Sequence, residues 1–424
     1  MSDLSEPMIA APAAPFARAT KTWLPVWHTR ERKTRIVFGA MVALCVLFAF
    51  AEYGTIAVWF VRLGPRWVNQ TFLFWGWSRF VHQAGAAALI YNPHALAHFE
   101  ASLPGAPAGG LPFAYPPTLL LLIWPLGSIG PVAAYLAWTG LGLAAYVWAG
   151  WERRGGARLA LLALISPATL IAVYNAQTSL FVAALMIGGC RLAGRRPVLA
   201  GVLFGLMAFK PQFGVLLPVA LVSARQWRVI VAAGVTGALT GLASVATFGI
   251  GSWVALPRAL AGLSAAVERH PEWNDHAPTV TGGLRLVGAA GGIVQAVQIA
   301  AALVAAGGVW FACRRGLTPL ASAALMVGAF FATPYAFVYD LPIVAYAVWI
   351  IVHERDASGA GFGSVEFAVL IGAVLLPALM GFHPLDAPWG MAVLAALFAV
   401  ILRRIARRRA GAGGDAGGWR AARA

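Results

Sequence analysis

Runs of apolar residues long enough to cross a lipid bilayer recur along this chain. The stretches 36–60, 131–151, 228–250 and 291–313 are examples, and each exceeds the roughly 20 residues that a crossing helix needs. Only 11% of the 424 residues are charged, against about 25% in soluble domains. The sequence therefore predicts an all-α membrane protein, a single polytopic helical bundle instead of several soluble domains.

Basic residues predict how this bundle is oriented. The net charge is +16, but arginines stand in short clusters beside apolar runs, as topology signals do. Nucleic-acid binding is therefore not expected. Placing every cluster in the cytoplasm, together with the N-terminus, gives about 11 transmembrane helices. The apolar piece 116–127 is too short to cross and is expected to be one of several re-entrant or short helices.

The same patterns divide the chain into three parts. Residues 1–35 are predicted to be a basic cytoplasmic tail, 36–410 the membrane domain, and the glycine-rich 411–424 a disordered tail. Two long outer loops are expected at 61–115 and 251–290. In the first loop, Trp75, Trp77 and Phe80 suggest either an aromatic face resting on lipid or, as the weaker alternative, a platform for stacking sugars.

Polar residues gather in the turns opposite the arginine clusters. These turns include "YNAQTS" at 174–179, "KPQ" at 210–212 and "TPYAFVYD" at 333–340. Several flanking apolar segments are too short to span, so the turns are predicted to lie below the outer surface. Polar groups at that depth are tolerated where they line a wet cavity or pair with one another. An outward-open polar cavity is the expected result.

Lys210 is the most conspicuous residue of these turns. Its ammonium group interrupts an apolar stretch, and insertion near mid-membrane costs about 2.5–3.5 kcal/mol. The lysine either reaches back to the membrane interface or faces an anion, for which a lipid phosphate is the natural candidate. Gln212, Asn175 and Gln177 would then supply neutral groups suited to hydroxyls.

Neither the cysteines nor the histidines predict a metal site. Cys45, Cys190 and Cys313 lie in apolar segments without CxxC spacing, so we interpret them as small hydrophobic residues. The histidines of the polar turns match no local ligand pattern. No cofactor is expected; a divalent cation is conceivable but not indicated.

Four segments together resemble glycosyltransferase family 87, the DUF2029 group of polytopic enzymes in the GT-C superfamily. They are "AYPPTLLLLIWPLG", "YNAQTSLFVAALMIGG", "RRPVLAGVLFGLMAFKPQFGVLLPVAL" and "FFATPYAFVYDL". They occur in the family's order between about Gln70 and Leu341, and the stretch 197–220 is the most specific.

This resemblance implies a mannosyltransferase-like enzyme with a GT-C-like fold. It implies a polyprenyl-phosphate-linked sugar as donor, a lipid or glycan as acceptor, and transfer with inversion at the anomeric carbon. It also implies a location in a bacterial-type inner membrane, with chemistry on the periplasmic face. Around Lys210 it places Gln212, Asn175, Gln177, Tyr335 and Asp340; Tyr115 belongs to the first matching segment, and Arg79 is a candidate contact for lipid phosphate.

The family's usual catalytic aspartate is missing. It begins a "DFxxFW"-like motif, whose counterpart here is "NQTFLFWGWSRF", so its position falls on Gln70 or Thr71. Neither side chain can take the proton of an acceptor hydroxyl, which an inverting transfer requires. Asp340, Glu52 and Asp275 are the candidate replacements.

Two alternatives follow from the same features. Short broken segments around a buried cation also occur in transporters, so a transporter or flippase of a lipid-linked or anionic solute is the first. The second is a non-catalytic family member that only binds lipid-linked sugars, because the usual aspartate is absent.

Overall fold

The computed structural model describes residues 32–63, 72–103, 112–151, 161, 164–358, 362–382 and 387–421. Within these ranges the protein is helical and contains no strand, in agreement with the predicted all-α class. In chain order, with η marking 3₁₀ helices, the elements are α1 (Arg32–Leu63), α3 (Leu73–Gln83), η1 (Ala87–Tyr91), α4 (Pro93–Ser102), α5 (Thr118–Ile123), η2 (Trp124–Ser128), α6 (Pro131–Gly150), α8 (Pro167–Tyr174), α9 (Ser179–Leu192), α10 (Pro197–Leu206), η3 (Met207–Phe209), η4 (Pro211–Gly214), α11 (Leu217–Ser223), α12 (Trp227–Phe248), α13 (Ile250–Arg269), η5 (Pro271–His276), α14 (Val280–Leu286), α15 (Gly291–Cys313), α16 (Pro319–Ala332), η6 (Val338–Asp340), α17 (Pro342–Ser358), α18 (Ser364–Phe382) and α19 (Trp389–Ala421).

Six helices in the described ranges are long and apolar enough to cross a membrane: α1, α6, α12, α13, α15 and α19. Other apolar helices have only 10–17 residues, fewer than the roughly 20 that a crossing needs. The predicted count of about 11 crossings is therefore not confirmed. The structure does confirm that the bundle mixes long helices with short apolar ones.

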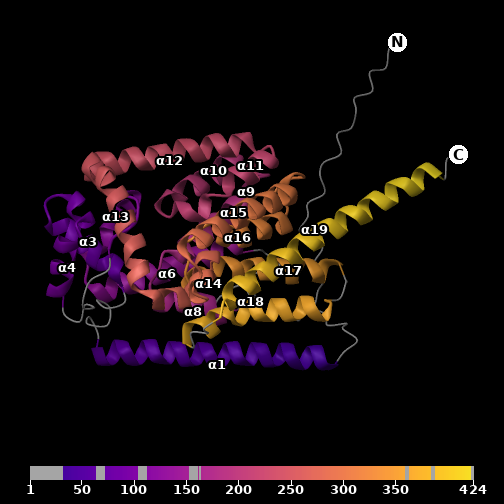
Figure 1. Cartoon of the computed structure of the whole chain (residues 1–424), viewed down its shortest axis with the longest axis horizontal. Coiled ribbons are helices and arrows are strands. Elements are labelled where there is room, and N and C mark those ends of the chain that lie inside the picture. Colours follow the sequence, from indigo (N-terminus) through magenta and orange to yellow (C-terminus); the bar gives the residue numbers. More distant parts are fainter. Residues whose placement is uncertain are drawn as a thin grey trace, which may run out of the picture.

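The six long helices are largely exposed, since at most 33% of the apolar window of each is buried. Figure 1 shows α1 and α12 along the long axis on opposite sides of the molecule. α12 exposes Val231, Val235, Leu239 and Leu242, each by more than half of its surface. This spacing places them on one face of the helix, as expected for a helix that faces lipid.

Helix α16 occupies the centre. Every residue from Leu320 to Phe330 is buried, and the helix packs against α15, α17 and α19. Its sequence, "PLASAALMVGAFFA", is rich in alanine, and small residues let membrane helices approach closely. Because α16 is fixed on all sides, the segment that leaves its end, residues 333–340, has a fixed starting point.

Glycines set the packing of α10 against α12. Gly201 and Gly205 are four residues apart, the small-xxx-small spacing of close helix pairs in membranes. A Cβ atom at Gly201 would lie 2.4 Å from the Ala232 Cβ, and one at Gly205 would lie 2.5 Å from the Thr236 Cβ. The two helices are thus in contact through their backbones, and α10 leads directly to Lys210.

A leucine at Gly201 is expected to separate these helices. Overpacking of a filled contact typically costs about 1–3 kcal/mol, and unfolding of the detergent-solubilised protein by denaturant would measure the loss. Gly234→Ala on α12 is the matched control, because nothing lies within 4 Å of a Cβ atom there. Equal stability of the Gly201→Leu variant and the control would contradict this packing.

Ion pairs and arginine contacts join the basic ends of several helices at one end of the bundle. Arg408 pairs with Glu354 of α17, and Arg404 pairs with Glu366 of α18. Arg409 donates to the carbonyls of Phe311 and Ala312 at the end of α15. These arginines all belong to α19, which runs away from α3 and α4 toward the C-terminus (Figure 1).

Where it is described, the segment predicted as the first outer loop is largely helical between residues 72 and 103, and its aromatic face packs against protein. Trp75, Trp77 and Phe80 are each less than 9% exposed. The Trp75 indole donates to the carbonyl of Ile129 on the neighbouring segment, and the Phe80 ring lies against Phe99 of α4. The prediction that this face rests on lipid is wrong, because α4 and η2 cover it.

The predicted loop 251–290 also contains regular structure. Its first part is α13, which is one of the six long apolar helices, and η5 and α14 follow. Figure 1 shows α13 running from the end of α12 obliquely toward the middle of the bundle. The helix continues through Pro257 in its interior, although a proline there removes one backbone hydrogen bond.

Candidate functional site

Lys210 lies at a break between two short helices. α10 passes into η3, and η4 begins at Pro211; a proline has no N–H and disrupts a continuing helix. Lys210 therefore has a non-helical backbone, with φ of −139° and ψ of 65°. Its side chain is almost completely buried, at 3% exposed. The break directs the ammonium group into the bundle.

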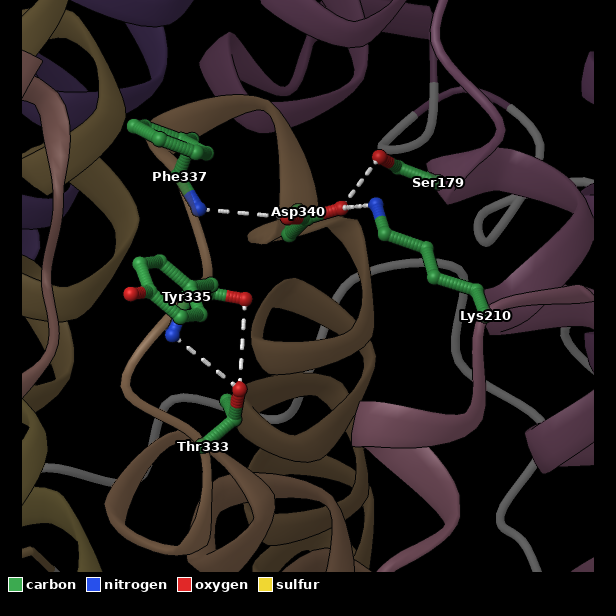
Figure 2. Close-up of polar contacts among 6 residues, drawn as sticks. All are labelled: Ser179, Lys210, Thr333, Tyr335, Phe337 and Asp340. Atoms are coloured by element: carbon green, nitrogen blue, oxygen red, sulfur yellow. Dashed lines mark hydrogen bonds and ion pairs between the residues drawn. The ribbon is translucent and has the colours of Figure 1, made fainter. Parts of the chain in front are cut away.

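The ammonium of Lys210 meets the carboxylate of Asp340, which lies at the end of η6, between α16 and α17. Asp340 Oδ1 accepts hydrogen bonds from Lys210 Nζ and from Ser179 Oγ, the latter at 2.6 Å. Its Oδ2 accepts the backbone N–H of Phe337 at 3.1 Å. Figure 2 shows these three donors converging on the carboxylate. We call Lys210, Asp340 and Ser179 the ion-pair centre.

The ion-pair centre explains how the charge of Lys210 is stabilised in the interior of the bundle. Two isolated charges would be expensive to remove from water, but a close pair with further hydrogen bonds compensates part of that cost. Lys210 Nζ also lies 5.3 Å from the centroid of the Phe213 ring and 5.6 Å from that of Tyr339. These distances are within the range of cation–π attraction. The lysine is therefore held inside the bundle and does not reach back to the interface.

Ser179 reaches the ion-pair centre through a constrained turn between α8 and α9. Ala176 in this turn has φ of 46°, which is unusual for a residue with a Cβ atom. Two donors from α6 hold the turn: the Trp138 indole bonds the carbonyl of Ala176, and the Tyr135 hydroxyl bonds that of Val173, both at 2.8 Å. A strained backbone conformation that neighbouring contacts hold in place is often found at functional sites.

Asn175 and Gln177 lie in the same turn and differ in their contacts. The Asn175 amide donates to the carbonyl of Ile171 at 2.9 Å, so it closes the end of its own helix. The side-chain oxygen of Gln177 is buried and has no hydrogen-bond partner among the described residues. Buried polar atoms are usually paired, which makes Gln177 the better candidate for a ligand contact.

Tyr115 approaches the ion-pair centre from the segment before α5. Burial, together with the negative charge of Asp340, raises the pKa of its phenol. The Tyr91 hydroxyl donates to the carbonyl of Tyr115 at 2.8 Å, and the Tyr115 ring contacts Phe74 and Phe113. The helices at the end of the bundle therefore hold this tyrosine near the carboxylate.

Tyr335 belongs to the strap, by which we mean residues 333–337 between α16 and η6. Its hydroxyl lies 3.0 Å from the Ser264 hydroxyl on α13, and its backbone N–H and carbonyl both bond the hydroxyl of Thr333 (Figure 2). The Thr279 hydroxyl donates to the carbonyl of Pro334 at 3.1 Å. The strap thus joins α13 and α14 to the segment that carries Asp340.

A sequence model of glycosyltransferase family 87 matches residues 113–339, more than half of the chain. The chain belongs to glycosyltransferase family 87. Comparisons with curated proteins and with solved structures gave no match. The family and the long apolar helices together make this protein a membrane glycosyltransferase.

The family match over residues 113–339 covers most residues at and around the ion-pair centre. It includes Tyr115, Ser179 and Lys210 and ends one residue before Asp340. Gln70 and Thr71, where the resemblance places the usual aspartate, lie before the matched region and outside the described residues. The ion-pair centre is therefore almost entirely within the part of the chain that defines family membership.

The other candidate carboxylates of this glycosyltransferase lie elsewhere in the bundle. Glu52 is buried on α1, which packs against α8 and α18. Asp275 is half-buried on η5 and borders a cavity between α14 and α19. No described contact joins either residue to Lys210. Within the described ranges, no three His, Cys, Asp or Glu side chains are grouped as a metal ion would require.

Two further predicted contacts lie at the edges of the site. Gln212 follows Lys210 by two residues and is half-buried. Arg79 on α3 is exposed and donates to the carbonyl of Gly127 at 3.2 Å, a contact that involves neither Lys210 nor Asp340. Arg79 therefore contributes to the packing of α3 on η2.

Sequence reasoning missed two residues. Ser179 stands in the quoted turn "YNAQTS", and its hydroxyl next to the first residues of α9 was the available signal. Glu100 is only 3% exposed and accepts the Trp77 indole N–H at 3.0 Å. An acid among the apolar residues of α4 was its signal, because an acid that becomes buried needs a partner.

Proposed function

We propose that this glycosyltransferase takes a sugar, mannose in the first instance, from a polyprenyl-phosphate-linked donor and transfers it to a lipid or glycan acceptor. The transfer proceeds with inversion at the anomeric carbon. It takes place at the end of the bundle opposite the arginine contacts, on the periplasmic face of an inner membrane, with the N-terminus in the cytoplasm.

The observation that carries this proposal is the buried ammonium of Lys210 in a membrane enzyme of this family. An ammonium group has three N–H donors, and the carboxylate of Asp340 accepts one of them. A phosphate oxygen of the donor can accept another. When the bond to the sugar breaks, negative charge develops on that phosphate, and a fixed cation in a buried site stabilises it strongly.

In this proposal, Asp340 is a positioning residue that holds the ammonium of Lys210. A carboxylate offers about four lone-pair sites, and Lys210, Ser179 and the Phe337 N–H occupy three of them. At most one lone-pair site of the carboxylate is then left to accept a hydrogen bond from an acceptor hydroxyl. Asp340 thus fixes the ammonium, while Glu52 and Asp275 are the other sequence candidates for accepting the proton.

The hydroxyls of the sugar would be recognised by neutral groups around the ion-pair centre. The unpaired side-chain oxygen of Gln177 and the phenol of Tyr115, which feels the charge of Asp340, are the first candidates. Gln212, Asn175 and Tyr335 would complete the contacts, and Arg79 would meet the head group of a neighbouring lipid.

The direct test uses the protein reconstituted in vesicles with a radiolabelled mannosyl polyprenyl phosphate and an extract of bacterial membrane lipids. We expect label in a lipid or glycan product, and none when a nucleotide sugar replaces the donor. Use of the nucleotide sugar would overturn the proposed donor. Movement of the donor across the bilayer without transfer would favour the transporter. Transfer that begins only when Asp is introduced at 70 or 71 would favour the non-catalytic member.

A further inference from the structure

Three arginines gather around one aromatic ring where α15 ends beside α19. The guanidinium carbons of Arg314 and Arg409 lie 4.9 and 4.4 Å from the centroid of the Phe311 ring, within the range of cation–π attraction. Arg409 also feels the charge of Arg315. We call Phe311, Arg314, Arg315 and Arg409 the Phe311 cluster. Nothing in the function described so far uses it.

The positive charge of the Phe311 cluster is not balanced by a carboxylate. Arg404 and Arg408 of α19 each pair with a glutamate, but among the described side chains no acid pairs with an arginine of the cluster. Arg409 donates to two backbone carbonyls at the end of α15, where the helix dipole is negative, so its charge is partly compensated. Arg314 and Arg315 are exposed, and their side chains donate to no described protein group.

The chemistry of the Phe311 cluster suits a phosphate group. Two guanidinium groups held against one ring repel each other, and an anion that contacts both removes this repulsion. A guanidinium binds two phosphate oxygens at once, and it stacks on aromatic rings because it is weakly hydrated. The exposed side chain of Arg314 has its N–H donors available for such an anion.

The face of α15 that leads to Arg314 indicates that the phosphate belongs to a lipid. Leu303, Gly307, Trp310 and Arg314 follow one another at helical spacing and share this face. Leu303 is 67% and Trp310 50% exposed, and nothing lies within 4 Å of a Cβ atom at Gly307. Because tryptophan favours the membrane–water boundary, apolar surface, indole and guanidinium follow in the order of the acyl chain, interface and head group of a phospholipid.

We propose that the Phe311 cluster binds the phosphodiester head group of an anionic phospholipid, with an acyl chain along the face of α15 from Leu303 to Trp310. Basic pockets between membrane helices bind anionic head groups in this way. A zwitterionic lipid binds less tightly, because its own ammonium neutralises its phosphate. The lipid serves as the counter-ion that joins α15 to α19. This inference does not rest on the proposed function.

Binding can be measured without any sugar transfer. Native mass spectrometry of the full chain in detergent would compare titrations of phosphatidylglycerol and phosphatidylcholine that carry the same acyl chains. Each basic residue near an anionic head group contributes a factor of about five in affinity. We therefore expect phosphatidylglycerol to bind at least fivefold more tightly. Equal affinities for the two lipids would overturn the proposal.

Variants connect this preference to the Phe311 cluster. Arg314→Gln/Arg315→Gln should lower the affinity for phosphatidylglycerol tenfold or more, and Arg314→Lys/Arg315→Lys should retain most of it. Arg403→Gln/Arg407→Gln is the matched control, because it removes the same charge from two exposed arginines of α19 outside the cluster. Equal losses in the two glutamine variants would indicate attraction to net charge alone and would overturn the site.

Two further measurements distinguish a lipid from a soluble phosphate. Inorganic phosphate and glycerol phosphate, at the concentration of the lipid, should not displace phosphatidylglycerol; displacement would overturn the lipid assignment. Gly307→Trp fills the open face of α15 without changing the charge and should weaken phosphatidylglycerol at least fivefold. Gly234→Trp, at an equally open position of α12, should not. Equal affinity in these two variants would contradict the placement of the acyl chain.

Stability gives an independent readout and controls for folding. A ligand that binds only the folded state stabilises it, so phosphatidylglycerol should raise the denaturant midpoint of the native protein more than phosphatidylcholine does. Arg314→Gln/Arg315→Gln should unfold at the native midpoint in phosphatidylcholine, because these side chains are exposed, and should gain nothing from phosphatidylglycerol. A native midpoint that is the same in both lipids, or a variant that gains as much as the native protein, would overturn the proposal.

Discussion

Replacement of Asp340 by alanine is expected to lower the free energy of unfolding by about 3–5 kcal/mol, the usual cost of leaving one partner of a buried ion pair alone. Lys210 is 3% exposed at its side chain, so its charge would stay buried without its carboxylate partner. Ser179 and the Phe337 N–H would lose their acceptor at the same time. Denaturant titration in detergent micelles would measure the loss.

The double variant Lys210→Met/Asp340→Leu is the control for this prediction. Apolar side chains of similar volume can replace a buried pair with little loss of stability, so the double variant should recover most of what Asp340→Ala loses. Ser179→Ala should cost only about 1 kcal/mol, the net value of one hydrogen bond. Equal losses in the single and double variants would show that the pair is not the source of the effect.

The same double variant is expected to lose sugar transfer although it folds. Without the ammonium, the leaving phosphate has no fixed cation, and kcat should fall at least 100-fold, which corresponds to about 2.7 kcal/mol of transition-state stabilisation. Lys210→Arg should retain more activity than the double variant because it keeps the charge, yet less than the native protein because the planar guanidinium needs another geometry.

Initial rates with a labelled polyprenyl-phosphate sugar would measure this effect. Gly234→Ala, which changes a position where nothing lies within 4 Å of the added atom, controls for the handling of a variant membrane protein. A folded double variant with native rates would exclude Lys210 from the chemistry, even if the family assignment stands.

The sequence predicted the all-α membrane class because apolar runs and charge clusters can be recognised within short segments of the chain. Apolar runs around 131–151, 228–250 and 291–313 correspond to α6, α12 and α15. The number of crossings could not be predicted in the same way. A run such as 319–332 can be apolar because it faces lipid or because it is surrounded by other helices, and α16 is buried from Leu320 to Phe330.

The pairing of side chains in the site could not be predicted from the sequence either. The apolar surroundings of Lys210 indicated that it needs an anion, but its partner Asp340 is 130 residues away. Both residues were singled out individually, yet pairing depends on how η4 packs against α16, which no local pattern encodes. Glu100 was missed for the same reason, since its partner Trp77 comes from another helix.

The most direct test of this account measures phosphate recognition without catalysis. Native mass spectrometry or calorimetry would compare binding of a polyprenyl phosphate with binding of the corresponding polyprenol, in the native protein and in the folded Lys210→Met/Asp340→Leu variant. The account predicts that the native protein prefers the phosphate at least tenfold and that the double variant shows no preference. A double variant that still prefers the phosphate would contradict it.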